Sequence, residues 1–133
     1  MTARARPLIL LADDEESFLE IMSVKLAASG FDIAVARNGA EALSQSEKLM
    51  PDLILMDIHM PGASGTDVAL AIKQRPATKN LRIAFLTNLK EPWPAVPADR
   101  RGLAMSLGME DFMEKTDNLD ATVEKIREIL SRR

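Results

Sequence analysis

The chain has 133 residues, a net charge of −3, 47% hydrophobic residues and no cysteine. This length suits one globular domain, and the lack of cysteine excludes disulfides, thiolate metal sites and a thiol nucleophile. The mild charge gives no basis for non-specific attraction to nucleic acid or an anionic membrane, and no apolar run approaches the roughly 20 residues that span a bilayer. We therefore expect a single cytoplasmic domain over residues 1–133, with a flexible basic N-terminus over residues 1–6 instead of a secretion signal.

The first predicted unit is a strand, an acidic turn and a helix. Residues 8–12 form a continuous apolar run that ends at four consecutive acids, residues 13–16. Apolar side chains then recur at helical spacing from Phe18 to Leu26, and Gly30 suits the C-terminal cap of that helix. Because a continuous apolar run is typical of a strand buried on both faces, the sheet is expected to be covered on both sides.

The second unit repeats the order of strand and helix. Residues 31–36 predict a strand, and Asn38 followed three residues later by Glu41 resembles a capping box that opens a helix. That helix must stop near Met50, because Pro51 disfavours the helical conformation in the residue before it.

The third strand is predicted over residues 53–57, where four apolar residues run without alternation into Asp57. This pattern is typical of a central strand that ends at a polar edge. A Pro61-Gly62 turn follows, and the segment up to Gly65 is predicted to be a loop. The apolar spacing over residues 68–75 then predicts a third helix.

The remaining elements are less regular in sequence. Residues 81–86 predict a fourth strand that ends at Thr87, and residues 88–97 hold three prolines within six positions, which predicts an extended loop. A short helix, a fifth strand and a final helix are expected over residues 98–107, 109–113 and 119–130. Five strands alternating with five helices predict an α/β fold with a parallel sheet.

Polar residues stand at the ends of four predicted strands: Asp13 with Asp14, Asp57, Thr87 and Lys115. In an open parallel sheet these ends share one edge, so the side chains are expected to converge. Converging carboxylates favour a hard divalent cation, and Mg²⁺ prefers oxygen ligands. Lys115 and Thr87 would suit a phosphoryl group beside the metal, and Asp57 on the central strand is assigned as the nucleophile.

Each of these residues has an ordinary interpretation when it is taken alone. Adjacent acids before a helix are favoured by the helix dipole, and Thr87 and Lys115 could simply end their strands. His59, the only histidine, is by itself typical of an exposed loop, and Trp93 between prolines is typical of loop packing. The prediction depends on the joint pattern.

The chain resembles the receiver domain of two-component response regulators from about Pro7 onward. The resemblance is carried by four segments: residues 10–15, 55–62, 85–87 and 108–115. It implies a flavodoxin-like (βα)5 doubly wound sheet with strand order 2-1-3-4-5. It also implies a signalling switch that catalyses only its own phosphorylation and dephosphorylation, and not a metabolic enzyme.

By that resemblance, Asp57 accepts a phosphoryl group from a sensor histidine kinase or a histidine phosphotransfer protein. Asp14, Asp57 and the backbone carbonyl of His59 would ligate Mg²⁺ directly, and Asp13 would act largely through water.

The resemblance also implies that Thr87 and Lys115 bind the phosphoryl oxygens, and that Thr87 and Phe112 form a switch. The face made by the fourth helix, fifth strand and fifth helix would then meet a downstream partner or output domain. A homodimer is compatible with this pattern, and direct nucleic-acid or membrane contact is not expected.

Three departures from the family pattern are present: Thr116 in place of a proline after Lys115, Asn88 in place of a small residue after Thr87, and a long proline-rich loop over residues 89–101. Two other functions therefore stay open. The first is an interaction module that signals without phosphorylation. The second is a small-molecule phosphatase or phosphotransferase, which is disfavoured because Ile58 and His59 offer no second acid beside the nucleophile.

Overall fold

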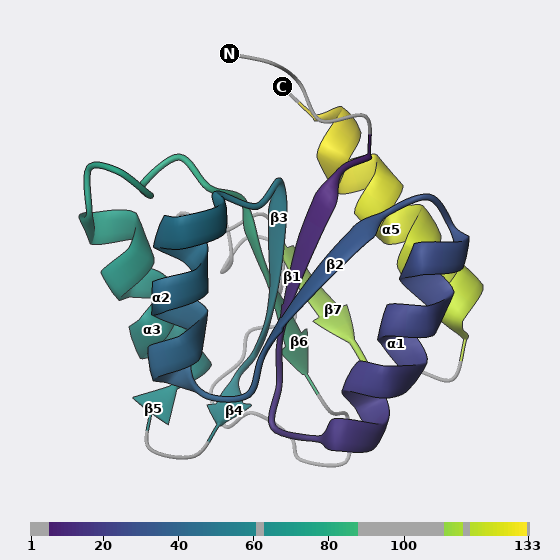
Figure 1. The fold of residues 1–133 in the computed structure, drawn as a ribbon, viewed down its shortest axis with the longest axis horizontal. Coiled ribbons are helices and arrows are strands. Elements are labelled where there is room, and N and C mark those ends of the chain that lie inside the picture. The colour runs from purple at the N-terminus through teal and green to yellow at the C-terminus, as the bar shows by residue number, and fades with distance from the viewer. Residues whose placement is uncertain (1–5, 61–62, 88–110, 116–117, 133) are drawn as a thin grey trace.

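The computed structural model describes residues 6–60, 63–87, 111–115 and 118–132. Its main sheet has five parallel strands in the spatial order β2-β1-β3-β6-β7 (Figure 1). Their bounds are β1 (Leu8–Ala12), β2 (Asp32–Ala36), β3 (Leu53–Asp57), β6 (Ile83–Thr87) and β7 (Asp111–Glu114). Numbered along the chain, these strands have the order 2-1-3-4-5, so the predicted flavodoxin-like topology is confirmed.

Helices cover both faces of this sheet, as the continuous apolar strands require. The described helices are α1 (Glu16–Ala28), α2 (Gly39–Leu49), α3 (Gly65–Gln74) and α5 (Leu119–Ser131). Figure 1 shows α2 and α3 on one face and α1 and α5 on the other. None of the described helices is long and apolar enough to cross a membrane.

Alternate residues of the central strands enter two separate cores. Ile9 and Leu11 of β1 pack in the cluster that contains the buried residues of α1 and α5. Leu10 and Ala12 pack in the other cluster, with the buried residues of α2 and α3. Because successive side chains of a strand point to opposite faces, an unbroken apolar run is the sequence form of this arrangement.

The predicted helix boundaries follow from local hydrogen bonds. The Asn38 side chain accepts a hydrogen bond from the Glu41 backbone N–H at 2.9 Å, which confirms the N-terminal cap of α2. Met50 ends that helix in the left-handed conformation, with φ 48°, just before Pro51. Gly30 lies two residues after the end of α1 with φ 101°, a conformation that favours glycine.

Two segments differ from the prediction. The loop after Asp57 contains a short antiparallel hairpin of β4 (His59–Met60) and β5 (Ala63–Ser64). Gly65 belongs to α3 and not to the loop, because the Ser64 side chain accepts a hydrogen bond from the Asp67 N–H and so caps that helix.

The fifth strand of the sheet, β7, begins at Asp111 and ends at Glu114. The start of the predicted strand at residues 109–110, the predicted loop over 88–97 and the predicted helix over 98–107 lie outside the described residues.

Candidate phosphoryl and metal site

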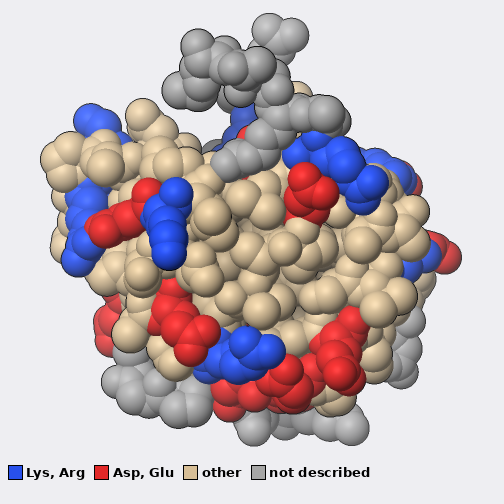
Figure 2. Space-filling model, viewed as in Figure 1, with Lys and Arg blue, Asp and Glu red and all other residues tan. Residues whose placement is uncertain are grey.

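Three carboxylates converge at the C-terminal edge of the sheet. Asp13 and Asp14 follow β1, Asp57 ends the neighbouring strand β3, and the parallel register pairs Ala12 with Met56. One carboxylate oxygen from each of the three acids lies within 4.8 Å of the others. The convergence of these acids, predicted from the strand ends, is therefore present. Figure 2 shows acidic side chains along the lower edge of the molecule, where α1 begins.

The three acids differ in their exposure to solvent. The Asp13 residue is 0% exposed and Asp57 is 6% exposed, whereas Asp14 lies on the surface. Asp13 Oδ1 accepts a hydrogen bond from the Glu15 backbone N–H at 2.9 Å. Burial raises the pKa of Asp13, and the hydrogen bond and charge of Lys115 oppose that shift.

Lys115 places its ammonium group among the acids, directly after β7. Its Nζ lies 2.7 Å from Asp13 Oδ2, 2.9 Å from Glu15 Oε1 and 3.5 Å from Asp57 Oδ2. Burial acts to lower the pKa of Lys115, but hydrogen bonds to Asp13 and Glu15 and the charges of Asp13 and Asp57 outweigh it and raise that pKa to about 12. The Phe18 ring lies beneath the same ammonium, with its centroid 4.9 Å from Nζ.

Gly65, the first residue of α3, packs directly against the backbone of Asp57 and Ile58. Its N–H donates to the Ile58 carbonyl at 2.7 Å, and the Ile58 N–H donates to the Leu86 carbonyl at 3.3 Å. A Cβ atom at position 65 would lie only 2.0 Å from the Asp57 carbonyl oxygen. The first turn of α3 can therefore approach the end of β3 this closely only with glycine at this position.

For the other predicted site residues, the structure describes the backbone but not the side chains. Thr87 ends β6 opposite Glu114, and Phe112 pairs in register with Phe85, while His59 lies in β4 two residues after Asp57. The side chains of Thr87, Phe112 and His59 lie outside the described part of the structure, so their predicted roles stay predictions.

Glu15 and Gly65 are two residues at this site that the sequence reasoning did not assign to it. Glu15 was recognisable as a third acid after β1, but its pairing with Lys115 joins residues 100 positions apart. Gly65 was recognisable as a glycine soon after the nucleophile strand, but its close approach to Asp57 is a tertiary feature.

The residues present fit a hard divalent cation. The candidate ligands are carboxylate oxygens, which Mg²⁺ prefers, and they belong to two neighbouring strand ends. Asp13 Oδ2 is buried, and its hydrogen bond from Lys115 Nζ at 2.7 Å is poorly directed, so their contact is chiefly an ion pair. A buried carboxylate oxygen in this state favours additional positive charge or an ordered water beside it.

Comparisons with known proteins agree on the class of this domain. The sequence model of the response regulator receiver domain matches residues 9–127. The alkaline phosphatase synthesis transcriptional regulatory protein PhoP of Bacillus subtilis is 32% identical over 93% of this chain and 48% of its own length. The phosphate regulon transcriptional regulatory protein PhoB of Rhizobium meliloti is 31% identical over 95% of this chain and 53% of its own length.

A solved structure of a response regulator also resembles this domain. The response regulator protein TrrA from Thermotoga maritima, in complex with Mg²⁺-BeF, superposes with a TM-score of 0.74 and 31% identity, over 92% of this chain and 98% of that one. The chain belongs to the response regulator receiver domain family, which are signalling domains of two-component systems. It spans about half the length of the curated relatives it matches.

Proposed function

We propose that this domain is a phosphorylatable receiver that accepts a phosphoryl group on Asp57 in a two-component phosphorelay. The observation that carries the proposal is the grouping of Asp13, Asp14 and Asp57 within 4.8 Å beside the ammonium of Lys115. A nucleophilic carboxylate, a cation site and a fixed positive charge are the parts that phosphoryl transfer requires.

In the proposed reaction, a carboxylate oxygen of Asp57 attacks the phosphorus atom of the donor. A new P–O bond forms while the bond between phosphorus and the donor imidazole nitrogen breaks. The electron pair of the broken P–N bond returns to the imidazole, and Asp57 becomes an acyl phosphate. A histidine kinase or a histidine phosphotransfer protein would supply the phosphoryl group. Hydrolysis by water would return Asp57 to the carboxylate and release inorganic phosphate.

Mg²⁺, when bound by Asp14, Asp57 and the backbone carbonyl of His59, would neutralise charge on the phosphoryl oxygens. Asp13 would act through water from its buried position. Lys115 would donate to a phosphoryl oxygen, and its short reach to Asp57 supports this role. In these roles the residues would catalyse only the phosphorylation and dephosphorylation of this domain itself.

The domain would exist in two conformations, and phosphorylation would stabilise one of them more than the other. The resulting shift in their populations would produce the output signal. Thr87 and Phe112 would form the switch, and the face made by β7, α5 and the helix predicted over residues 98–107 would meet a downstream partner or a linked output domain. Several relatives are named as transcriptional regulatory or DNA-binding proteins. We therefore propose a partner or a further domain as the recipient of the signal, in the cytoplasm.

Intact-mass spectrometry after incubation with acetyl phosphate tests the proposal. Wild-type protein with Mg²⁺ should gain one phosphoryl group, and samples without Mg²⁺ should not. Asp57→Asn should also gain none, because the amide is a poor nucleophile. Protein that gains no mass but still binds Mg²⁺ would contradict phosphorylation and favour the phosphorylation-independent interaction module.

A further inference from the structure

Glu15 contacts Lys115 in a way that the proposed reaction does not use. Its Oε1 lies 2.9 Å from Lys115 Nζ, and the contact is a hydrogen bond as well as an ion pair. The Glu15 side chain is 54% exposed, whereas the Lys115 side chain is 11% exposed. The contact therefore joins a largely exposed carboxylate to a mostly buried lysine side chain.

The acids around Lys115 would compete with a phosphoryl group for its hydrogen bonds. A lysine ammonium has three N–H donors, and the distances of 2.7, 2.9 and 3.5 Å place Asp13 and Glu15 closer to it than Asp57. A phosphoryl group on Asp57 would need at least one of those donors. Because the Asp13 and Glu15 carboxylates attract the ammonium and neutralise part of its charge, a shift of Lys115 toward the phosphoryl group would lengthen its contact with Asp13 or with Glu15.

Glu15 is the partner that can be released at the lower cost. Asp13 is buried and held through Oδ1 by the Glu15 backbone N–H, so moving it would leave a buried charge without its partner. The Glu15 side chain can rotate toward the solvent, where water hydrates its carboxylate. Solvent screens the Glu15 side of this ion pair, so its loss costs less than the loss of the buried contact with Asp13.

We propose, on the basis of the proposed function, that Glu15 is a positioning residue that holds Lys115 in the unphosphorylated state. By competing for the ammonium, it weakens the binding of a phosphoryl group at Asp57. Loss of the Glu15 carboxylate contact should therefore make Lys115 more available and tighten the binding of a phosphoryl mimic by about two- to fivefold, which lies within the range that a solvent-screened ion pair supports.

The test is titration of beryllium fluoride at saturating Mg²⁺, followed by ¹⁹F NMR, on three variants. Glu15→Gln removes the charge, and Glu15→Asp keeps the charge but shortens the side chain by one methylene. Glu16→Gln is the matched control, because it removes the next carboxylate, which pairs with Arg37 and not with Lys115. Saturating Mg²⁺ separates the affinity for the mimic from the affinity for the metal.

The expected result is two- to fivefold tighter binding by both Glu15 variants and unchanged binding by Glu16→Gln. Tighter binding by Glu15→Gln alone would assign the effect to charge and overturn the proposed contact. Unchanged or weaker binding by Glu15→Gln would overturn it as well. If the unaltered protein binds no beryllium fluoride, the result contradicts the proposed function. If the unaltered protein binds it and Glu15→Gln does not tighten that binding, the result contradicts only the proposal for Glu15.

A second readout needs no phosphoryl mimic. NMR of the lysine side chains in the free protein should show a shifted Lys115 signal in both Glu15 variants and an unshifted one in Glu16→Gln. An unchanged Lys115 signal in Glu15→Gln would show that the contact does not form in solution and would also overturn the proposal.

Discussion

At the scale of single residues, the site is built around one ammonium group. Lys115 offsets part of the cost of burying Asp13, and the burial of that acid is the first cause of its raised pKa. The stability that Lys115 contributes through its raised pKa is fully present below its ordinary value of 10.5 and is lost as pH rises toward about 12. At neutral pH the lysine is therefore charged.

Gly65→Ala should be strongly destabilising. The added Cβ would meet the Asp57 carbonyl oxygen at 2.0 Å, so the start of α3 must move away from β3. We expect a loss of more than about 3 kcal/mol in the free energy of unfolding, at the upper end for overpacked sites. Urea denaturation measures this change.

Gly30→Ala is the matched control for that substitution. Its Cβ would meet no atom within 4 Å, and the cost comes only from φ 101°. A backbone cost of about 1 to 2 kcal/mol is expected there. Equal losses for the two variants would show that the contact between α3 and the Asp57 backbone is not tight.

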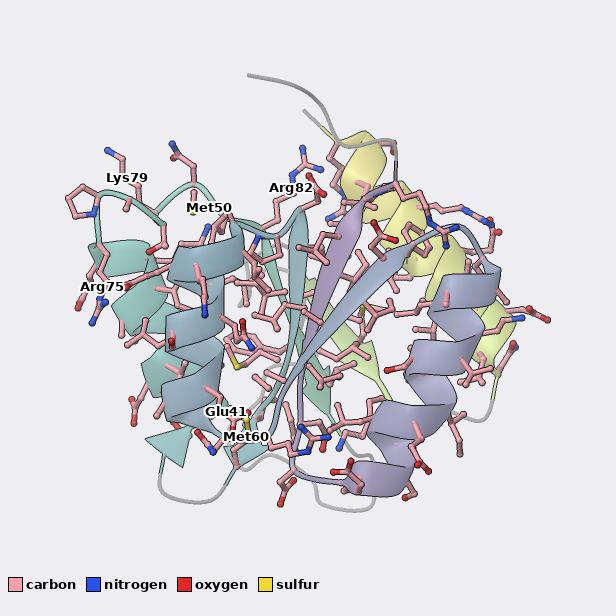
Figure 3. The ribbon with its side chains drawn as sticks, in the orientation of Figure 1. Glu41, Met50, Met60, Arg75, Lys79 and Arg82 are labelled. Carbon is pink, nitrogen blue, oxygen red and sulfur yellow. The ribbon has the colours of Figure 1, made fainter. Side chains whose placement is uncertain are left out.

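At the scale of elements, charged side chains join α1 to its neighbours. Lys25 pairs with Asp120 at the start of α5, and Arg37 donates two hydrogen bonds of 2.8 Å to Glu16. Arg82, labelled in Figure 3, donates at 2.8 Å to the Ile129 carbonyl in the last turn of α5, which also accepts from the Arg132 N–H. All three contacts lie at or near helix ends.

Asp120→Asn should make stability less dependent on pH in the acid range. The hydrogen bond and the charge of Lys25 lower the pKa of Asp120 from its ordinary value of 3.8. The unfolded chain therefore binds more protons in this range, and the contribution of the pair is present above pH 3.8 and lost as pH falls below it. Urea midpoints measured across this range should fall less steeply for the variant.

Lys25→Gln supplies the partner test for the same ion pair. It should remove the same part of the acid dependence, and the double variant should remove no more than either single variant, because both changes delete one interaction. Additive effects in the double variant would mean that Asp120 and Lys25 act on stability independently.

At the scale of the whole molecule, metal binding should be linked to folding. Asp57 lies far from Asp13 and Asp14 in the sequence and joins them in the folded chain, so Mg²⁺ should bind the native state in preference to the unfolded state. At a Mg²⁺ concentration ten times the Kd, the gain should be about 1.4 kcal/mol, or roughly 5 °C in Tm. Thermal denaturation with and without Mg²⁺ measures it.

Asp14→Asn should abolish most of that gain with little effect on stability in the absence of metal, because its side chain is exposed. Glu20→Gln, which removes an exposed acid from α1, should keep the full response to Mg²⁺. An equal response in both variants would exclude Asp14 from the metal site.

The sheet and its acids could be predicted because they depend on short-range patterns. Unbroken apolar runs marked strands with two buried faces, and the parallel topology brought Asp13 and Asp57 to one edge. The contact between Glu15 and Lys115 could not be predicted, because it depends on side-chain conformations at distant positions. The sequence predicts a loop at Gly65, whereas the glycine begins α3, and its role depends on how closely α3 approaches β3.

Mapping the phosphorylated residue is the most direct test of Asp57 as the nucleophile. Protein treated with acetyl phosphate and Mg²⁺ would be reduced with borohydride, which converts an aspartyl phosphate to homoserine, and then digested for peptide mass spectrometry. We predict homoserine at position 57 and at no other carboxylate. Homoserine at Asp13 or Asp14, with position 57 unchanged, would contradict the assignment of the nucleophile.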